Sequence, residues 1–289
     1  MRFGAIEAGG TKFVLAVGTK DGEILEKTSI PTEHPDTTIE KIYEFFKNKN
    51  ISSIGLGCFG PIDLDKDSKT YGYITMTTKE EWKFFDIVSA LKEKLSVPIF
   101  LDTDVNAAVL GEAQFGSAKD VKSALYLTIG TGIGGGYVVD GNLLHGMMHP
   151  EMGHIYLQRR FDDDFEGHCS YHKTCFEGLA SGPAIESRWK QSSKDLPKGH
   201  PAWDLEAYYI GLALSKYILI LSPEKIILGG GVMSQKHLFP MIHKYVQEIL
   251  AGYIHSDHII SEEIEDFIVS PGLGDESGIK GALALAILG

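Results

Sequence analysis

Cysteine, basic charge and long apolar runs are scarce in this 289-residue sequence, and each shortage excludes a class of protein. Three cysteines are too few for the disulfide framework of a small secreted protein, and Cys58, in an apolar strand, is interpreted as a core residue. Lys and Arg total 27 against 39 Asp and Glu, and the net charge of -12 opposes binding to nucleic acid. No run approaches the ~20 apolar residues of a membrane helix, and no signal peptide is recognisable. We therefore expect a cytoplasmic protein with no nucleic-acid or membrane partner.

One pattern of elements occurs twice along the chain. Residues 3–7 and 13–18 are predicted strands around a glycine turn, and the second strand ends in an Asp-Gly turn. The same succession returns at residues 124–142. This repeat predicts an α/β protein of two similar lobes, with a glycine hairpin from each lobe on the walls of a cleft. The expected lobes are residues 1–115, the smaller, and 116–289, the larger, with the last helix a candidate to pack back on the first lobe.

Apolar periodicity predicts the other elements. Residues 37–48, for example, place Ile39 and Ile42 on one helical face. Residues 191–203 contain two prolines and are predicted to be a loop. The other expected helices are residues 86–95, 104–115, 176–190, 204–221, 237–250 and 276–288, and the other expected strands are residues 53–58, 98–101, 225–228 and 266–269.

Three glycine loops each follow an expected strand. Their backbone N–H groups can approach a phosphate closely, and the first loop adds a hydroxyl and a positive charge. Any one such loop is more often a simple tight turn. None has P-loop spacing, and the second loop matches the glycine spacing of a dinucleotide fingerprint but leads into a strand instead of a helix. The loops are Gly9-Gly10-Thr11-Lys12, residues 128–136 with Thr131 and Gly132 in the middle, and Gly229-Gly230-Gly231.

Two acidic residues stand where a strand is expected to end and a helix to begin. Phosphoryl transfer to a hydroxyl needs one carboxylate aligned with the attacking oxygen. Asp104 falls in the first helical turn, where the helix dipole favours its ionised form. On this feature alone, the preferred interpretation is that Asp102 or Asp104 caps the helix.

The two remaining cysteines lie close together with a histidine between them. Cys169, His172 and Cys175 are spaced three residues apart, and His154 precedes Cys169 by 15 positions. Two Cys and two His suit a tetrahedral, structural zinc ion, which we favour over free thiols beside surface histidines. Spacing leaves two other candidates for the fourth ligand, His149 and His168.

In their order along the chain these motifs resemble the ROK family of sugar kinases, within the actin-like ATPase (ASKHA) superfamily. Besides the loops, the resemblance rests on residues 101–112 (LDTDVNAAVLGE), 151–154 (EMGH) and 180–183 (ASGP). It implies a two-lobed α/β fold of the actin-like, ribonuclease H-like type. Three positions depart from the family pattern: Glu7 stands where Asp is usual, Thr103 where Asn is usual, and His172 where many members have Cys.

The resemblance also implies a role for each motif. Asp104 would be the catalytic base, and the zinc ion would hold the wall of the sugar site. The first two glycine loops, Gly9 to Lys12 and Thr131-Gly132, would bind the phosphates of ATP, and Gly229, Gly230 and Gly231 would flank adenosine. The implied sugar contacts are Gly60, Pro61, Thr103, Asp104, Glu151, His154 and Glu177, and the implied zinc ligands are His154, Cys169, His172 and Cys175.

Three further stretches, residues 59–63 (FGPID), 71–75 (YGYIT) and 145–154 (HGMMHPEMGH), resemble the bacterial fructokinase branch of the family. They imply transfer of phosphate from ATP, with Mg²⁺, to the 6-hydroxyl of D-fructose, in a homodimer. A preference for glucose, mannose or N-acetylmannosamine remains an alternative. A sugar-sensing repressor would need a DNA-binding segment before Gly9, for which we expect no room. An Hsp70-like or actin-like ATPase would lack the Cys/His cluster.

Overall fold

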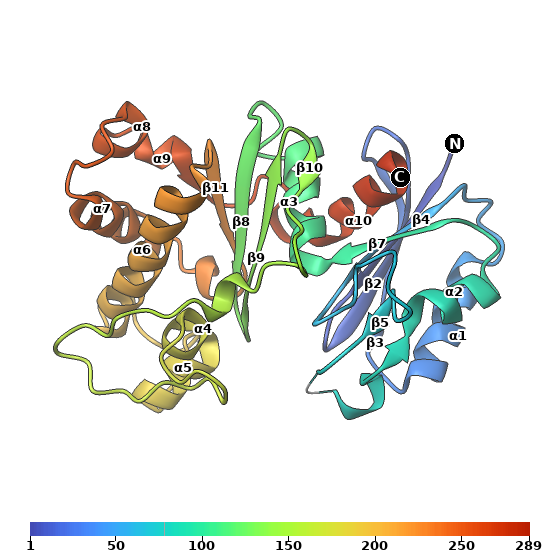
Figure 1. Cartoon of the computed structure of the whole chain (residues 1–289), viewed down its shortest axis with the longest axis horizontal. Coiled ribbons are helices and arrows are strands. Elements are labelled where there is room, and N and C mark those ends of the chain that lie inside the picture. Colours follow the sequence, from blue (N-terminus) through green and yellow to red (C-terminus); the bar gives the residue numbers. More distant parts are fainter. Residues whose placement is uncertain (78) are drawn as a thin grey trace. The chain divides into compact units, whose positions relative to one another are not determined.

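The structure is a computed structural model that describes residues 1–77 and 79–289 (Figure 1). The chain forms two compact units. The expected lobe boundary between residues 115 and 116 stays a prediction. Across the described part of the chain, no helix combines the length and the apolarity needed to cross a membrane. The first unit comprises Met1–Asp120, Gly136–Pro150 and Gly272–Gly289, and the second comprises Val121–Gly135 and Glu151–Pro271.

The sheet of the first unit has the strand order β3-β2-β1-β4-β7. β2 is antiparallel to both β1 and β3, whereas β4 is parallel to β1 and β7 is parallel to β4. The carboxyl ends of the three parallel strands therefore meet at one edge, where Ala8, Cys58 and Thr103 stand in register. Residues next to these positions are brought close together by the sheet. The strands are β1 (Phe3–Ala8), β2 (Lys12–Gly18), β3 (Ile24–Pro31), β4 (Ile54–Cys58) and β7 (Ile99–Thr103).

Apolar side chains cover both faces of this sheet. Since successive residues of a strand point to opposite faces, Ile6 joins the cluster that contains Ile42 of α1 and Leu91 of α2. Ala5 joins a different cluster, with Leu283 of α10. Figure 1 shows α1 and α2 on one side of the sheet and α10 on the other. The helices are α1 (Pro35–Phe46), α2 (Ile87–Lys94) and α10 (Ser277–Leu288).

Helix α3 (Asp104–Phe115) crosses α10 at positions that have no side chain. A Cβ atom on Gly281 would lie 1.7 Å from Ala107 O, and one on Gly111 would lie 2.7 Å from Gly281 N. Near the other end of α3, the fully buried carboxylate of Glu112 accepts a hydrogen bond of 2.7 Å from Ser277 Oγ. The start of α3 therefore has a fixed place relative to the sheet and to the last helix.

The second sheet, of order β10-β9-β8-β11-β12, repeats the arrangement of the first. Three consecutive strands lie side by side, and two later strands are then added parallel to β8 and β11. The predicted α/β class and internal repeat are confirmed. Strand β9 begins in the second unit and ends in the first. The strands are β8 (Ser123–Ile129), β9 (Ile133–Val139), β10 (Asn142–Leu143), β11 (Lys225–Gly229) and β12 (Ile268–Val269).

Several elements differ from the sequence prediction. The expected helix at residues 176–190 is two helices, because Ser181 Oγ accepts a hydrogen bond of 3.3 Å from Ala184 N and caps the second one. Strands β3 and β10 were not predicted, and β9 begins within the second glycine loop. The expected strand at residues 266–269 shortens to β12. The helices of the second unit are α4 (Phe176–Ala180), α5 (Gly182–Trp189), α6 (Ala202–Leu221), α7 (Leu238–Leu250), α8 (Asp257–Ile260) and α9 (Ile264–Phe267).

Candidate active site

The predicted base, Asp104, is the first residue of α3. Thr103 ends β7 and caps the helix, because its Oγ1 accepts a hydrogen bond of 3.1 Å from Asn106 N. Asp104 Oδ1 accepts a hydrogen bond of 2.9 Å from Val105 N, at the positive end of the helix dipole. The interpretation that Asp102 or Asp104 caps the helix is therefore wrong, because the Thr103 hydroxyl is the cap. Asp104 is instead a partly exposed carboxylate at a fixed position.

Asp102 is the centre of a polar network behind the helix start. Its side chain is buried, and Oδ1 accepts hydrogen bonds from Thr103 N (2.8 Å) and from Asn106 Nδ2 (2.7 Å). Oδ2 lies 2.9 Å from Nε2 of His145. This contact with Asp102 raises the pKa of His145, against the opposing effect of burial. His145 opens the stretch HGMMHPEMGH, and no local pattern around it indicated a role.

Glu7, near the end of β1, is electrostatically linked to the predicted base. Burial, together with the negative charge of Asp104, raises the pKa of Glu7 from 4.5 to about 7, although Lys12 opposes the shift. The side chain has room because residue 278 is a glycine: a Cβ atom there would lie 2.5 Å from Glu7 Cδ. Gly278 belongs to α10, and nothing in the local sequence around it indicated this contact.

The first glycine loop is the turn between β1 and β2. Gly9 N donates a hydrogen bond of 3.0 Å to Lys12 O, and the loop is braced from outside by Thr32, whose hydroxyl donates to Gly9 O at 2.7 Å. Thr11 and Lys12 are exposed. The Thr11 hydroxyl and the Lys12 ammonium group are therefore exposed to solvent on a turn that hydrogen bonds hold in place.

The residues predicted to contact sugar from the FGPID segment follow β4. Gly60 and Pro61 are partly exposed, and Ile62 N donates a long hydrogen bond, 3.5 Å, to Nε2 of His149. His149 is buried in the first unit. His149, one of the other candidates for the fourth zinc ligand, therefore lies beside the Gly60–Ile62 turn.

In the second unit, the second glycine loop is bound to Glu177. Glu177 Oε2 accepts a hydrogen bond of 2.9 Å from Ile133 N, and a Cβ atom on Gly132 would lie 2.8 Å from the same oxygen. Gly130 O also accepts a hydrogen bond of 2.7 Å from Gly182 N. The carboxylate predicted to contact sugar is thus in direct contact with the loop predicted to contact phosphate.

The Glu151–His154 segment packs against the same loop. A Cβ atom on Gly153 would lie 1.8 Å from Ile133 O, so only glycine fits there. Tyr217 of α6 donates a hydrogen bond to Met152 O and anchors the segment from below. The backbone carrying Glu151 and His154 is therefore determined by close contacts on both sides.

The third glycine loop follows β11. Gly230 has φ of +90°, and a Cβ atom there would lie 2.5 Å from Ile129 O, so this position requires glycine. Gly229 approaches the hydroxyl of Tyr126, whereas a Cβ atom on Gly231 would meet nothing within 4 Å. Only the last of the three glycines thus faces open space.

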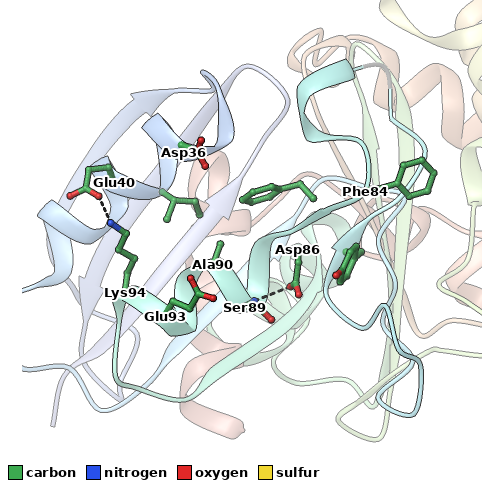
Figure 2. A pocket seen from close by; sticks show the side chains of 11 residues that line it. Asp36, Glu40, Phe84, Asp86, Ser89, Ala90, Glu93 and Lys94 are labelled. Atoms are coloured by element: carbon green, nitrogen blue, oxygen red, sulfur yellow. Dashed lines mark hydrogen bonds and ion pairs between the residues drawn. The ribbon is translucent and has the colours of Figure 1, made fainter.

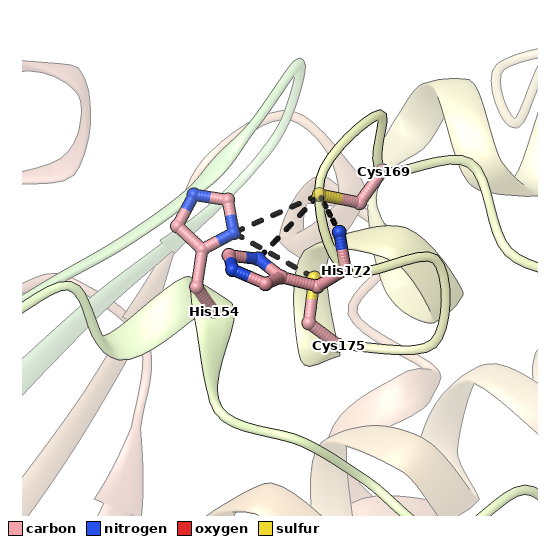
Figure 3. Close-up of side chains that lie close together, drawn as sticks. All are labelled: His154, Cys169, His172 and Cys175. Atoms are coloured by element: carbon pink, nitrogen blue, oxygen red, sulfur yellow. Dashed lines mark hydrogen bonds between the residues drawn. The ribbon is translucent and has the colours of Figure 1, made fainter.

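The four predicted zinc ligands converge in the second unit (Figure 3). Their ligand atoms all lie within 4.8 Å of one another, and neither His149 nor His168 belongs to this group among the described residues. Nδ1 of His154 lies 3.9 Å from Cys169 Sγ and 3.6 Å from Cys175 Sγ, and Nδ1 of His172 lies 3.8 Å from Cys169 Sγ.

These separations fit a tetrahedral zinc site. Zn–S bonds of about 2.3 Å and Zn–N bonds of about 2.0 Å at a tetrahedral angle separate sulfur from nitrogen by about 3.5 Å. Burial raises the pKa of Cys175 to about 11, so a thiolate there is unfavourable without a nearby cation. The donor types, their number and their spacing all suit zinc.

A pocket of about 660 Å³ lies between α1 and α2 of the first unit (Figure 2). Four carboxylates line it, and its single lysine, Lys94, is paired with Glu40 at 2.5 Å. Asp86 Oδ1 accepts a hydrogen bond of 2.9 Å from Ser89 N and so caps α2. Among the described residues, the lining of this pocket includes none of those predicted to bind nucleotide, sugar or metal.

Known proteins resemble the chain over nearly its whole length. A family model described as "ROK family" matches residues 3–288. A fructokinase of Pediococcus pentosaceus is 43% identical, over 99% of this chain and 98% of its own, and one of Streptococcus mutans is 41% identical, over 98% and 97%. The crystal structure of a ROK hexokinase from Thermus thermophilus matches with a TM-score of 0.82 at 27% identity, over all of this chain and 98% of that one. The predicted actin-like ATPase fold is confirmed.

Proposed function

The chain belongs to the ROK family, and we propose that it is a kinase that transfers the terminal phosphate of ATP to the 6-hydroxyl of D-fructose. The observation that carries the proposal is its identity of more than 40% to two fructokinases over nearly the full length of each chain. A change of sugar within such a family requires changes in the residues that contact the sugar. Fructose is therefore favoured over glucose, mannose and N-acetylmannosamine.

Asp104 is the proposed base. Its carboxylate would accept the proton of the 6-hydroxyl as the oxygen attacks phosphorus, and the bond from phosphorus to the leaving ADP oxygen breaks. The start of α3 supports this role, since the helix dipole favours the ionised carboxylate and Thr103 holds the first turn in place. Because the transition state is loose, accurate positioning matters more than a shifted pKa.

The glycine loops and Glu7 are proposed to hold ATP with Mg²⁺. Thr11 and Lys12 would contact phosphate together with Thr131 and Gly132, while Gly229, Gly230 and Gly231 would lie along adenosine. Glu7, when ionised, would supply a hard carboxylate oxygen of the kind that Mg²⁺ prefers. Magnesium bound with ATP would neutralise charge on the phosphates.

Zinc is proposed to organise the sugar side of the site. His154 is both a member of the Cys/His cluster and part of the Glu151–His154 segment, so a bound zinc ion would hold Glu151 in place for the sugar hydroxyls. Glu177 follows Cys175 by two residues and would be held by the same ion. We further propose a homodimer, which light scattering coupled to size-exclusion chromatography would test.

The test is ADP release from ATP and Mg²⁺, measured for zinc-loaded protein with fructose, glucose, mannose and N-acetylmannosamine in turn. We expect the highest kcat/KM with fructose and loss of turnover in Asp104→Asn. Turnover mainly with another of these sugars would support the kinase activity and overturn the choice of fructose as substrate. ADP release that no sugar stimulates would overturn the kinase itself and favour an ATPase.

A further inference from the structure

We propose that His145 is a positioning residue for the phosphoryl-transfer step, because it holds Asp102 and through it the first turn of the helix that begins with Asp104. The inference rests on the proposed kinase function. It adds a residue from outside the recognised base motif, brought to that motif by the fold.

The two carboxylate oxygens of the buried Asp102 side chain contact different partners. Asp102 is 4% exposed. Oδ1 accepts both of its hydrogen bonds from the start of α3, through Thr103 N and Asn106 Nδ2. Oδ2 is directed at Nε2 of His145, 2.9 Å away. A buried carboxylate oxygen without a hydrogen-bond partner is unfavourable, so the carboxyl group either takes up a proton or moves toward another partner. Either change in Asp102 would disturb the first turn of α3.

Among the described residues, few polar groups other than Asp102 approach the His145 side chain. The ring is 39% exposed, and its other close polar neighbour is Asn106 Nδ2, at 3.4 Å from Nε2. The segment that carries it is held independently by the pairing of β10 with β9 and by the contact of His149 with Ile62 N. Loss of His145 should therefore affect Asp102 more than it affects folding.

The charges around the ring favour this arrangement. Asp102 raises the pKa of His145, and burial and the ammonium group of Lys66 lower it, with a net upward direction. Tyr71 also feels the Asp102 charge, which raises the pKa of its hydroxyl after the larger effect of burial. The contact with Asp102 Oδ2 is thus the first cause of the raised pKa of His145, and the 2.9 Å separation of the two groups shows the pairing directly.

The experiment compares His145→Ala with His145→Gln, whose amide nitrogen can occupy the place of Nε2. In the alanine variant we expect kcat to fall by about tenfold to a hundredfold, as for a small misplacement of a reacting group, while KM for fructose changes less than about twofold. Glutamine should restore most of kcat. The matched control is His34→Ala in the same unit, since His34 forms an exposed pair with Asp36 at 3.6 Å, and it should leave kcat unchanged.

Combination with Asp102→Asn tests whether His145 acts through Asp102. If it does, His145→Ala should cost little further kcat in the Asp102→Asn background. Full additivity, or an unchanged kcat in folded His145→Ala, would overturn the proposal. So would a loss confined to KM, or equal losses in the alanine and glutamine variants.

A readout independent of catalysis separates this inference from the kinase assignment. Proton NMR of the full-length protein should follow the ring titration of His145, with a pKa above about 6.5 that falls when Asp102 becomes Asn. An identical titration in both proteins would overturn the pairing even if fructose is phosphorylated. The expected shift in a protein that releases no ADP would instead place the failure in the proposed function.

Discussion

The ionisation of Glu7 makes the stability of the first unit dependent on pH. Its pKa is raised from 4.5 to about 7, first by burial and then by Asp104. Since the unfolded chain keeps the ordinary value, the folded state holds the proton more tightly between these two pKa values. The free energy of unfolding is therefore unaffected below about pH 4.5, decreases as pH rises toward about 7, and levels off above it.

The size of this effect follows from the difference between the two pKa values. At about 1.4 kcal/mol per unit, a shift from 4.5 to about 7 costs about 3 kcal/mol when Glu7 is fully ionised. Integrated between pH 5 and pH 8, the decrease should be about 2 to 3 kcal/mol. Glu7→Gln removes the ionisation and keeps the side-chain volume, so the difference between wild type and this variant isolates the effect from all groups that do not interact with Glu7.

The assay is urea unfolding of both proteins at pH 5, 6, 7 and 8, without ATP or Mg²⁺. Wild type should lose stability relative to Glu7→Gln as pH rises. Asp104→Asn removes the second cause of the raised Glu7 pKa, so the decrease in unfolding free energy should end at a lower pH. Parallel pH profiles for wild type and Glu7→Gln, within about 0.5 kcal/mol, would refute the assignment of a raised pKa to Glu7.

Three other substitutions test the remaining parts of the site and fold. Asp104→Asn should fold with an unchanged circular dichroism spectrum and lose at least about a hundredfold in kcat; more than a tenth of wild-type turnover would remove Asp104 from the mechanism. Cys175→Ser should lower the zinc content measured by atomic emission, lower the melting temperature and raise KM for fructose, whereas unchanged zinc would argue against the cluster. Gly281→Ala, whose Cβ atom would meet Ala107 O at 1.7 Å, should lose about 1 to 3 kcal/mol of stability. Gly199→Ala is its control, because nothing lies within 4 Å of that Cβ position, and equal stability of the two variants would contradict the packing argument.

Local patterns in the sequence were sufficient to predict most of the strands and helices, whereas most roles of the candidate residues came from the family resemblance and stay predictions. Buried strands such as β1 and β8 are apolar runs next to glycine, and α3 begins after a hydroxyl residue, so both kinds of element are visible in short windows. Strands β3 and β10 are largely exposed and mix polar with apolar residues, and they form because neighbouring strands offer them hydrogen-bonding partners. Because these strands depend on the strands beside them, their own short segments of sequence do not indicate them.

The candidate site shows the same limit. The Cys/His cluster was predicted from spacing, because three of its members lie within seven residues. Spacing favoured His154 as the fourth ligand without excluding His149 or His168, and only the family resemblance selected His154.

What the sequence by itself determined is the chemistry available: a carboxylate at a helix start, glycine loops, and soft ligands close together in the chain. Only the tertiary structure decided which residues meet. His145 reaches Asp102 across 43 positions, and Gly278 makes room for Glu7 from the far end of the chain. The physical reason is that such contacts depend on the packing of strands and helices that are remote in sequence, which short-range periodicity does not encode.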